Sequence, residues 1–172
     1  MKVILYSTIT VNGIIARQNG EEDFLSDKNW QIFSKIARDS GCLIIGRKTF
    51  GKVSKWKDYN FDRIKNTNKI VLSKSNIPNL KKDYFIADSP KRALAKAKSL
   101  GFKSVVIGGG SHTSASFMKE GLVDEVIFNI EPTILGNGIK VFAEASFEKR
   151  LKLINIKKLP EGIVQLHYKV VE

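Results

Sequence analysis

Cysteine and histidine are scarce in this 172-residue sequence, which has one cysteine and two histidines. The single cysteine, Cys42, excludes an internal disulfide and cannot form a metal cluster by itself. His112 and His167 have no second ligand close by in the sequence, so we expect no metal site. Long apolar runs are also missing, because the segment from residue 3 to residue 9 is too short for a signal peptide or a membrane span. We therefore expect a soluble, cytoplasmic protein without a membrane partner.

The excess of positive charge is not arranged as a nucleic-acid site. The formal net charge is +12, yet the lysines are dispersed, without an arginine-rich run or interleaved aromatic residues for base stacking. A diffuse positive field suits anionic small molecules equally well, because it raises their rate of encounter. A Gly-x-Ser-x-Gly elbow and a Walker-type lysine are missing too, which argues against hydrolases and NTPases. We expect a small-molecule ligand rather than nucleic acid.

Apolar strands alternate with helical segments along the chain. Alternation up to about residue 110 favours parallel pairing with helices on both faces, whereas the last two strands, joined at residues 160 to 162, favour an antiparallel hairpin. The predicted fold is one α/β domain over residues 1 to 172, with a mixed, mainly parallel sheet of about eight strands. The strands are predicted at residues 2 to 9, 42 to 46, 69 to 73, 84 to 87, 104 to 108, 125 to 131, 151 to 159 and 163 to 171, and the helices at residues 26 to 40, 47 to 53, 90 to 100 and 114 to 120.

Three consecutive glycines, Gly108, Gly109 and Gly110, follow one of these strands, and a helix is predicted from about Ser114. Because glycine has no Cβ, backbone N–H groups there can approach a ligand closely, and the positive end of the helix favours an anion. The G-x-G-x-x-G spacing of the doubly wound dinucleotide folds is absent, and a plain strand-to-helix turn is the alternative. The segment by itself indicates a phosphate site with that alternative open.

Two further strand ends carry similar chemistry. Residues 46 to 49 read Gly-Arg-Lys-Thr after one strand, and residues 73 to 75 read Ser-Lys-Ser after another. Arginine offers a planar fork of donors and lysine a point charge, and both suit a phosphate ester. Ligands of open α/β sheets bind outside the carboxyl ends of the strands, so the three strand ends can converge on one extended polyphosphate.

Three segments resemble the NADPH-binding segments of the dihydrofolate reductase superfamily: LIIGRKTF, IVLSKS and VVIGGG. A downstream segment is more similar to the pyrimidine reductase branch of riboflavin biosynthesis and its small stand-alone relatives: GLVDEVIFNIEPTILGNGIKVF. The resemblance extends from LYSTITVNGIIA near the N-terminus to the final strands, and it implies NADPH as the cofactor. The cofactor-binding residues that follow from it are Ile15, Gly46, Arg47, Lys48, Thr49, Leu72, Ser73, Lys74, Gly108, Gly109, Gly110 and Ser111.

The resemblance also indicates the substrate site. A nicotinamide across these strand ends would reach the first strand and the loop after it, beginning at Thr8, and the first helix would offer Trp30 and Phe33 to a planar heterocycle. In dihydrofolate reductases a carboxylate four residues before a phenylalanine of this helix holds the pterin. That position is Asn29 here, and an amide cannot supply the charge that favours protonation. We consider Asn29 and the nearest carboxylate, Asp27, as catalytic residues, with helix-dipole stabilisation as the alternative role of Asp27.

Three functions fit these features. The leading prediction is reduction of dihydrofolate to tetrahydrofolate by NADPH, in one-carbon metabolism, because the chain is compact, has no deaminase domain and presents an aromatic helix face. The second is reduction of the 5-amino-6-ribosylaminouracil phosphate of riboflavin biosynthesis, favoured by the segment EPTILGNG and by Asn29. The third is a basic binding protein that keeps the fold without turnover. We expect a monomer or a homodimer.

Overall fold

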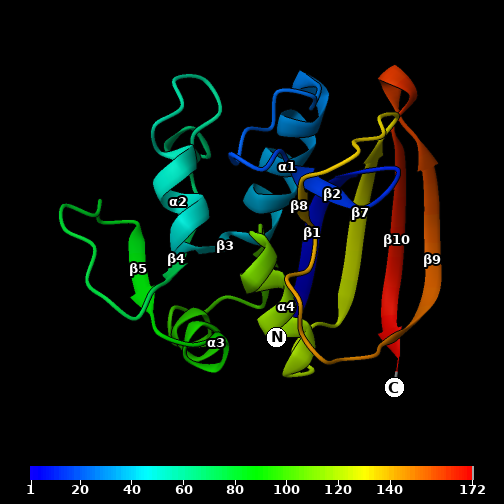
Figure 1. Ribbon diagram of the computed structural model, residues 1–172. Helices are drawn as coiled ribbons and strands as arrows, with labels where there is room; N and C mark the ends of the chain where they lie inside the picture. Colours follow the sequence, from blue (N-terminus) through cyan, green and yellow to red (C-terminus); the bar gives the residue numbers. More distant parts are fainter. Residues whose placement is uncertain (172) are drawn as a thin grey trace.

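A mixed eight-stranded sheet organises the molecule (Figure 1). The structure is a computed structural model that describes residues 1 to 171. The strands of the sheet are β1 (Lys2–Thr10), β3 (Cys42–Gly46), β4 (Asn68–Leu72), β5 (Tyr84–Ala87), β6 (Ser104–Ile107), β7 (Glu125–Glu131), β9 (Arg150–Lys158) and β10 (Val164–Val171). They follow the order β5-β4-β3-β6-β1-β7-β10-β9, parallel from β5 to β7 and antiparallel at β10 and β9. The predicted fold class is confirmed.

Helices cover both faces of the parallel part of the sheet. On one face α1 (Asp27–Ser40) and α2 (Arg47–Val53) pack in a core cluster that includes Leu43 and Ile45 of β3. On the other face α3 (Pro90–Ser99) and α4 (Ser111–Lys119) pack in a cluster that includes Ile44. Successive side chains of a strand point to opposite faces, so β3 must be apolar along its length, and all five of its residues are buried.

The antiparallel side of the sheet carries no such cover. Figure 1 shows β10 and β9 at the side of the sheet away from the four helices, joined through the short helix η2 (Pro160–Gly162). Every residue of β9 is exposed, including Leu151, Leu153 and Ile156. The predicted hairpin is therefore confirmed, and it extends the sheet as an exposed edge.

Two local features differ from the sequence-based expectation. The helix predicted from Ser114 begins three residues earlier, at Ser111, because Gly110 takes the extended backbone of an N-cap directly after the glycines. A second, two-stranded sheet joins β2 (Ile14–Ala16) to β8 (Ile139–Lys140). These strands have only three and two residues, too few for an alternating pattern to be recognised in the sequence.

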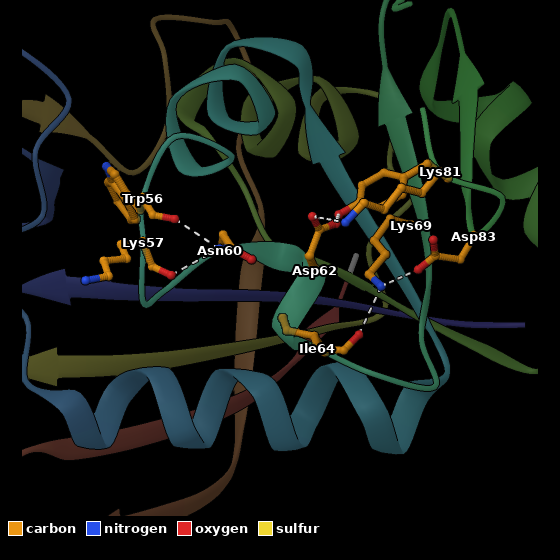
Figure 2. A network of polar contacts seen from close by, with 9 residues as sticks. Trp56, Lys57, Asn60, Asp62, Ile64, Lys69, Lys81 and Asp83 are labelled. Atoms are coloured by element: carbon orange, nitrogen blue, oxygen red, sulfur yellow. Dashed lines mark hydrogen bonds and ion pairs between the residues drawn. The ribbon is translucent and has the colours of Figure 1, made fainter. Parts of the chain in front are cut away.

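A buried lysine ties the long connection after α2 to the sheet (Figure 2). Lys69 of β4 is 1% exposed, and its ammonium donates to the Ile64 carbonyl at 2.9 Å and to the Asp83 carboxylate at 2.7 Å. Ile64 follows the short helix η1 (Phe61–Arg63), in which Asp62 accepts from Lys81 at 2.6 Å. The network therefore ties the segment that contains Tyr59 and Phe61 to the sheet. No helix within residues 1 to 171 has the length and apolar character needed to cross a membrane.

Candidate active site

A cavity of about 1230 Å³ opens at the carboxyl ends of β1, β3, β4 and β6. This is the edge of an open α/β sheet at which ligands bind. The strand ends, the start of α1, the segment after α2 and the loop between β2 and α1 line it. Every residue predicted for the site contributes to this lining except Ser73 and Lys74, which lie just beyond it at the end of β4.

Glycines allow the strand ends to approach one another at one end of the cavity. The Gly46 N–H donates to the Gly109 carbonyl at 2.9 Å, which joins the end of β3 to the end of β6. A Cβ added at Gly110 would lie 2.6 Å from the Thr49 hydroxyl, and one added at Gly46 would overlap the hydroxyl of Thr113. Gly109 has a φ of +85°, which favours glycine, and open space where a Cβ would be. Gly109 is buried but lines the cavity, with room for a ligand at this position.

Cationic side chains flank these glycines. The Arg47 guanidinium, at the start of α2, donates to the Ser75 hydroxyl at 2.9 Å and so connects the ends of β3 and β4. Ser73 is buried, and its hydroxyl donates to the Ser75 carbonyl at 2.7 Å. Lys48 and Lys74 are exposed beside them. The arrangement offers a fork of donors and two exposed point charges to an anion.

Aromatic side chains form another wall of the cavity, which adjoins the glycines at Phe33. The Phe33 ring stacks on the Tyr6 ring with centroids 5.6 Å apart and an interplanar angle of 29°. The Trp30 ring contacts those of Phe33 and Tyr59, at centroid separations of 5.7 and 5.8 Å. The predicted pair Trp30 and Phe33 is thus part of a larger apolar surface, suited to a planar ring.

Both the oxygen and the nitrogen of the Asn29 side-chain amide form hydrogen bonds within the protein. Its oxygen accepts from the Asn129 amide at 2.7 Å and from the Thr8 hydroxyl at 3.2 Å. Its nitrogen donates to the Glu131 carboxylate and to the Ser26 hydroxyl. Asn29 is 2% exposed. The amide therefore fixes the start of α1 against β1 and β7.

Asn129 and Glu131, both on β7, complete this network. Asn129 is fully buried, donates to the Tyr6 hydroxyl at 2.8 Å and accepts from the Gln165 amide at 2.8 Å. Glu131, also buried, accepts from the Ser26 backbone N–H at 2.8 Å. Burial raises the pKa of the Tyr6 hydroxyl, so it stays protonated and available as a donor. The sequence-based prediction did not include these two β7 residues, although polar residues near the end of a largely apolar strand were a usable signal.

The loop between β2 and α1 also contributes to the cavity lining. Arg17 pairs with Asp23 within the loop, and Glu21 pairs with Lys52 of α2. Glu22 lies between these pairs and lines the cavity. Loss of hydration, with a smaller contribution from neighbouring Glu21, raises the pKa of the Glu22 carboxyl to about 7. Asp27 is exposed in the first turn of α1, and its carboxylate accepts from the Tyr59 hydroxyl.

Metal chemistry has no obvious location in this site. Within the described part of the chain, residues 1 to 171, no three His, Cys, Asp or Glu side chains come together as a possible metal site. Cys42 is buried, and its burial raises the pKa of the thiol to about 12. Its contribution is to the packing of β3.

Two B. subtilis proteins resemble this chain over nearly its whole length, and a third protein resembles it over less than half. YwjB of Bacillus subtilis, which is uncharacterized, is 28% identical over 170 residues that cover 97% of each chain. YyaP, a second uncharacterized B. subtilis protein, is 26% identical over 176 residues, 97% of this chain and 94% of YyaP. The riboflavin biosynthesis protein RibD of Aquifex aeolicus is 33% identical over 78 residues, which cover 43% of this chain and 22% of RibD.

Solved structures share the fold. A Shewanella sp. PV-4 protein, provisionally named a riboflavin biosynthesis protein, superposes with a TM-score of 0.81, at 23% identity and over the whole of both chains. The Thermotoga maritima diaminohydroxyphosphoribosylaminopyrimidine deaminase/5-amino-6-(5-phosphoribosylamino)uracil reductase superposes with a TM-score of 0.76 at 18% identity. This chain is covered to 99% in that match and spans 56% of the T. maritima chain.

These comparisons correct one prediction. Dihydrofolate as the substrate, and with it a place in one-carbon metabolism, is wrong, because the matching family model belongs to riboflavin biosynthesis. The site agrees with the correction: where a dihydrofolate reductase offers a carboxylate to the pterin, Asn29 turns its amide into the protein. The resemblance to the pyrimidine reductase branch is confirmed, since the model of the RibD C-terminal domain matches residues 1–165. The chain belongs to the RibD C-terminal domain family.

Proposed function

We propose that the chain is an NADPH-dependent oxidoreductase whose substrate contains the 5-amino-6-ribosylaminouracil ring system. The observation that carries this proposal is one cavity lined both by a wall of glycines and cations and by a wall of aromatic rings. A dinucleotide cofactor needs the first wall and a planar substrate ring needs the second. Membership of the RibD C-terminal domain family supports a pyrimidine as that ring.

The residues at the strand ends fit the cofactor. Backbone N–H groups at the start of α4, next to Gly109 and Gly110, would hold the pyrophosphate. Arg47, Ser73 and Lys74 would hold the 2′-phosphate that distinguishes NADPH from NADH. Ile15 would contact the nicotinamide. Bound NADPH would supply the hydride, and the protein would orient the ring and exclude water.

Other side chains have roles at the substrate end. Trp30 and Phe33 would pack on the ring, and Thr8 lies between the ring position and the buried network. Asp27 is our candidate for a proton relay, because its carboxylate lines the cavity. Asn29 would act through the position of α1, since its amide already bonds to Asn129 and Glu131.

The direct test follows NADPH absorbance with 5-amino-6-ribosylaminouracil, in its free and phosphorylated forms, and with dihydrofolate as the negative control. Oxidation of NADPH with a pyrimidine form supports the proposal. Binding of NADPH without oxidation would instead favour a binding protein on this fold, and absence of NADPH binding would contradict both. Cytoplasmic location and a monomeric or homodimeric state stay predictions, checked by fractionation and light scattering.

NADPH is expected to bind more tightly than NADH, and Arg47→Ala to remove about tenfold or more of that preference. The reason is that a charge-assisted contact to a phosphate is worth roughly 1.5 to 3 kcal/mol. Titration of both cofactors measures the effect. Arg92→Ala is the control, because Arg92 pairs with Asp88 on the exposed side of α3, away from the cavity lining. Equal affinity of the unmutated protein for the two cofactors would contradict this placement of the 2′-phosphate.

Gly109→Ala is expected to weaken NADPH binding by about tenfold or more, because the added methyl group would occupy space in front of the pyrophosphate. Gly101→Ala is a matched control: its φ of +86° and open surroundings are close to those of Gly109, but Gly101 lies just after α3 and does not line the cavity. Both changes add similar backbone strain, of about 1 to 2 kcal/mol. Equal effects of the two variants on affinity would show that the glycines serve chain geometry alone.

A further inference from the structure

Polar side chains form a row across three neighbouring strands of the sheet and end at the cavity. The register pairs Thr8 of β1 with Asn129 of β7, and Asn129 with Gln165 of β10. Paired residues of adjacent strands present their side chains on the same face of a sheet. The amide of Asn29, on α1, contacts both Thr8 and Asn129. Thr8 and Asn29 are the members of this group that line the cavity.

Glu131 fixes the direction in which hydrogen bonds run through this row. One oxygen of its carboxylate, Oε1, accepts from the Ser26 backbone N–H at 2.8 Å, and the Asn29 amide contacts the same oxygen. An oxygen that already accepts from a backbone N–H can be met by the NH₂ group of Asn29 but not by its carbonyl, because two acceptors repel each other. The Asn29 oxygen must therefore face the other way, toward Thr8 and Asn129.

This orientation of Asn29 determines the direction of the remaining hydrogen bonds. The NH₂ group of Asn129 donates to the Asn29 oxygen at 2.7 Å and to the Tyr6 hydroxyl at 2.8 Å, which uses both of its hydrogens. The oxygen of Asn129 accepts from the Gln165 amide at 2.8 Å. Because the Tyr6 oxygen accepts from Asn129, the hydrogen of Tyr6 is directed to the Thr8 hydroxyl oxygen, 3.3 Å away.

Thr8 is the end of this row at the cavity, and the single hydrogen of its hydroxyl is already engaged within the protein. That hydrogen is donated to the Asn29 oxygen at 3.2 Å, and one lone pair of the hydroxyl receives the hydrogen of Tyr6. A threonine hydroxyl has one donor and two acceptor positions. The position that remains is an acceptor, and it belongs to a partly buried residue of the cavity lining.

Resting on the proposed function, we propose that Thr8 is a specificity-determining residue that accepts a hydrogen bond from the amino edge of the substrate ring. In an aminouracil this edge carries donors at the ring N1–H and at the amines on C6 and C5, whereas the opposite edge carries carbonyl oxygens on both sides of N3–H. A carbonyl placed at Thr8 would meet a lone pair, and both oxygens would lose a hydrogen bond to water. Thr8 therefore determines which edge of the ring is turned toward β1.

The test compares two ring probes, 5,6-diaminouracil and 5,6-dimethyluracil, on the NADP⁺-loaded protein and on its Thr8→Val variant. Methyl groups replace the two amines at similar size, while the carbonyls of the probes are the same. Both tryptophans of the chain, Trp30 and Trp56, line the cavity, so their fluorescence reports binding. Valine has the shape of threonine without the acceptor. We expect Thr8→Val to lower the affinity ratio, diamino over dimethyl, by at least about fivefold.

Two variants serve as controls for Thr8→Val. Thr8→Ser keeps the hydroxyl, so the affinity ratio should stay within about twofold of that of the unmutated protein. Thr133→Val makes the same change at another partly buried threonine, outside the cavity lining, and should leave the ratio unaltered. Valine is closer to threonine in shape than serine is, so a role of Thr8 in packing alone would give the opposite order of the two Thr8 variants.

A second measurement needs no ligand. The Asn29 nitrogen lies 3.4 Å from the Ser26 hydroxyl, whereas the Asn29 oxygen faces Thr8. In NMR spectra of the free protein, we expect the side-chain NH₂ protons of Asn29 to give stronger NOEs to the Ser26 β-protons than to the Thr8 methyl group. The reverse pattern would reverse the direction of the row, leave the Thr8 hydrogen available to a ligand, and overturn the proposal.

The outcomes separate this inference from the proposed function. Equal weakening of both probes by Thr8→Val would mean that Thr8 contacts a ring carbonyl, and unchanged affinities would mean that it contacts neither edge; each result overturns the inference alone. Failure of both probes to bind the NADP⁺-loaded protein overturns the inference and the pyrimidine assignment together. Failure of NADP⁺ itself to bind contradicts the proposed function, and the two probes are then titrated on the free protein.

Discussion

Replacing Asn129 with leucine is expected to lower the free energy of unfolding by about 3 kcal/mol or more. Leucine has a similar size but removes the donors to the Tyr6 hydroxyl and the Asn29 amide oxygen, and the acceptor for Gln165. A buried polar group left without a partner costs roughly 1 to 3 kcal/mol. Tyr6 and Asn29 are both buried, so little water can replace the lost contacts. Urea denaturation followed by circular dichroism measures the change.

Asn155→Leu is the control for Asn129→Leu. Asn155 lies on the exposed strand β9, where water hydrates the amide, so its replacement should change stability by about 0.5 kcal/mol or less. Because Asn129 also fixes the start of α1 through Asn29, the variant should weaken the aromatic wall as well. A loss of less than about 1 kcal/mol for Asn129→Leu would mean that the buried network is not a major support of the cavity.

Lys69→Met is expected to cost about 2 to 3 kcal/mol. Methionine fills much of the same volume but leaves the buried Ile64 carbonyl without its donor and Asp83 without its cation. The Asp83 side chain is 36% exposed, so water compensates part of its loss, and the expected cost is below that of a fully buried pair. The segment that carries Phe61 and Tyr59 should loosen first, which hydrogen exchange of residues 58 to 66 would detect.

Lys81→Met belongs to the same network and serves as the matched control (Figure 2). Lys81 also contacts a carboxylate, that of Asp62, but its side chain is 63% exposed. Exposed ion pairs are worth about 0 to 1 kcal/mol, so this change should be nearly neutral. Similar losses for Lys69→Met and Lys81→Met would show that burial does not determine what these lysines contribute.

The secondary structure could be predicted from the sequence largely because helices cover both faces of the parallel strands. Such strands are apolar at nearly every position, and the segments from Cys42 to Gly46 and from Ser104 to Ile107 stand out for that reason. Glycines and hydroxyl residues mark where these strands end. The short strands β2 and β8 have no comparable pattern, since their pairing comes from contact between distant segments.

The convergence of the polar strand ends was predictable for a related physical reason. The carboxyl ends of parallel strands meet at one edge of a sheet, so residues that follow three such strands must approach one another. The contact of Arg47 with Ser75, and that of Gly46 with Gly109, are instances of this. Whether these residues bind NADPH is a separate matter, which the cofactor titrations test.

The sequence by itself determined the eight strands of the main sheet, the four helices and the polar residues at the strand ends, because these depend on local patterns of burial and backbone conformation. The tertiary structure decided which distant side chains meet. The order of strands places β7 next to β1, with Asn129 opposite Thr8, and so brings a carboxylate and an amide from β7 against Asn29, about 100 residues away in the chain. Folding of the loop between β2 and α1 also places Glu22 in the cavity lining. Local sequence patterns do not specify the order of the strands or the path of a loop. The contacts of Asn29 with β7 and the position of Glu22 could therefore not be inferred from the sequence.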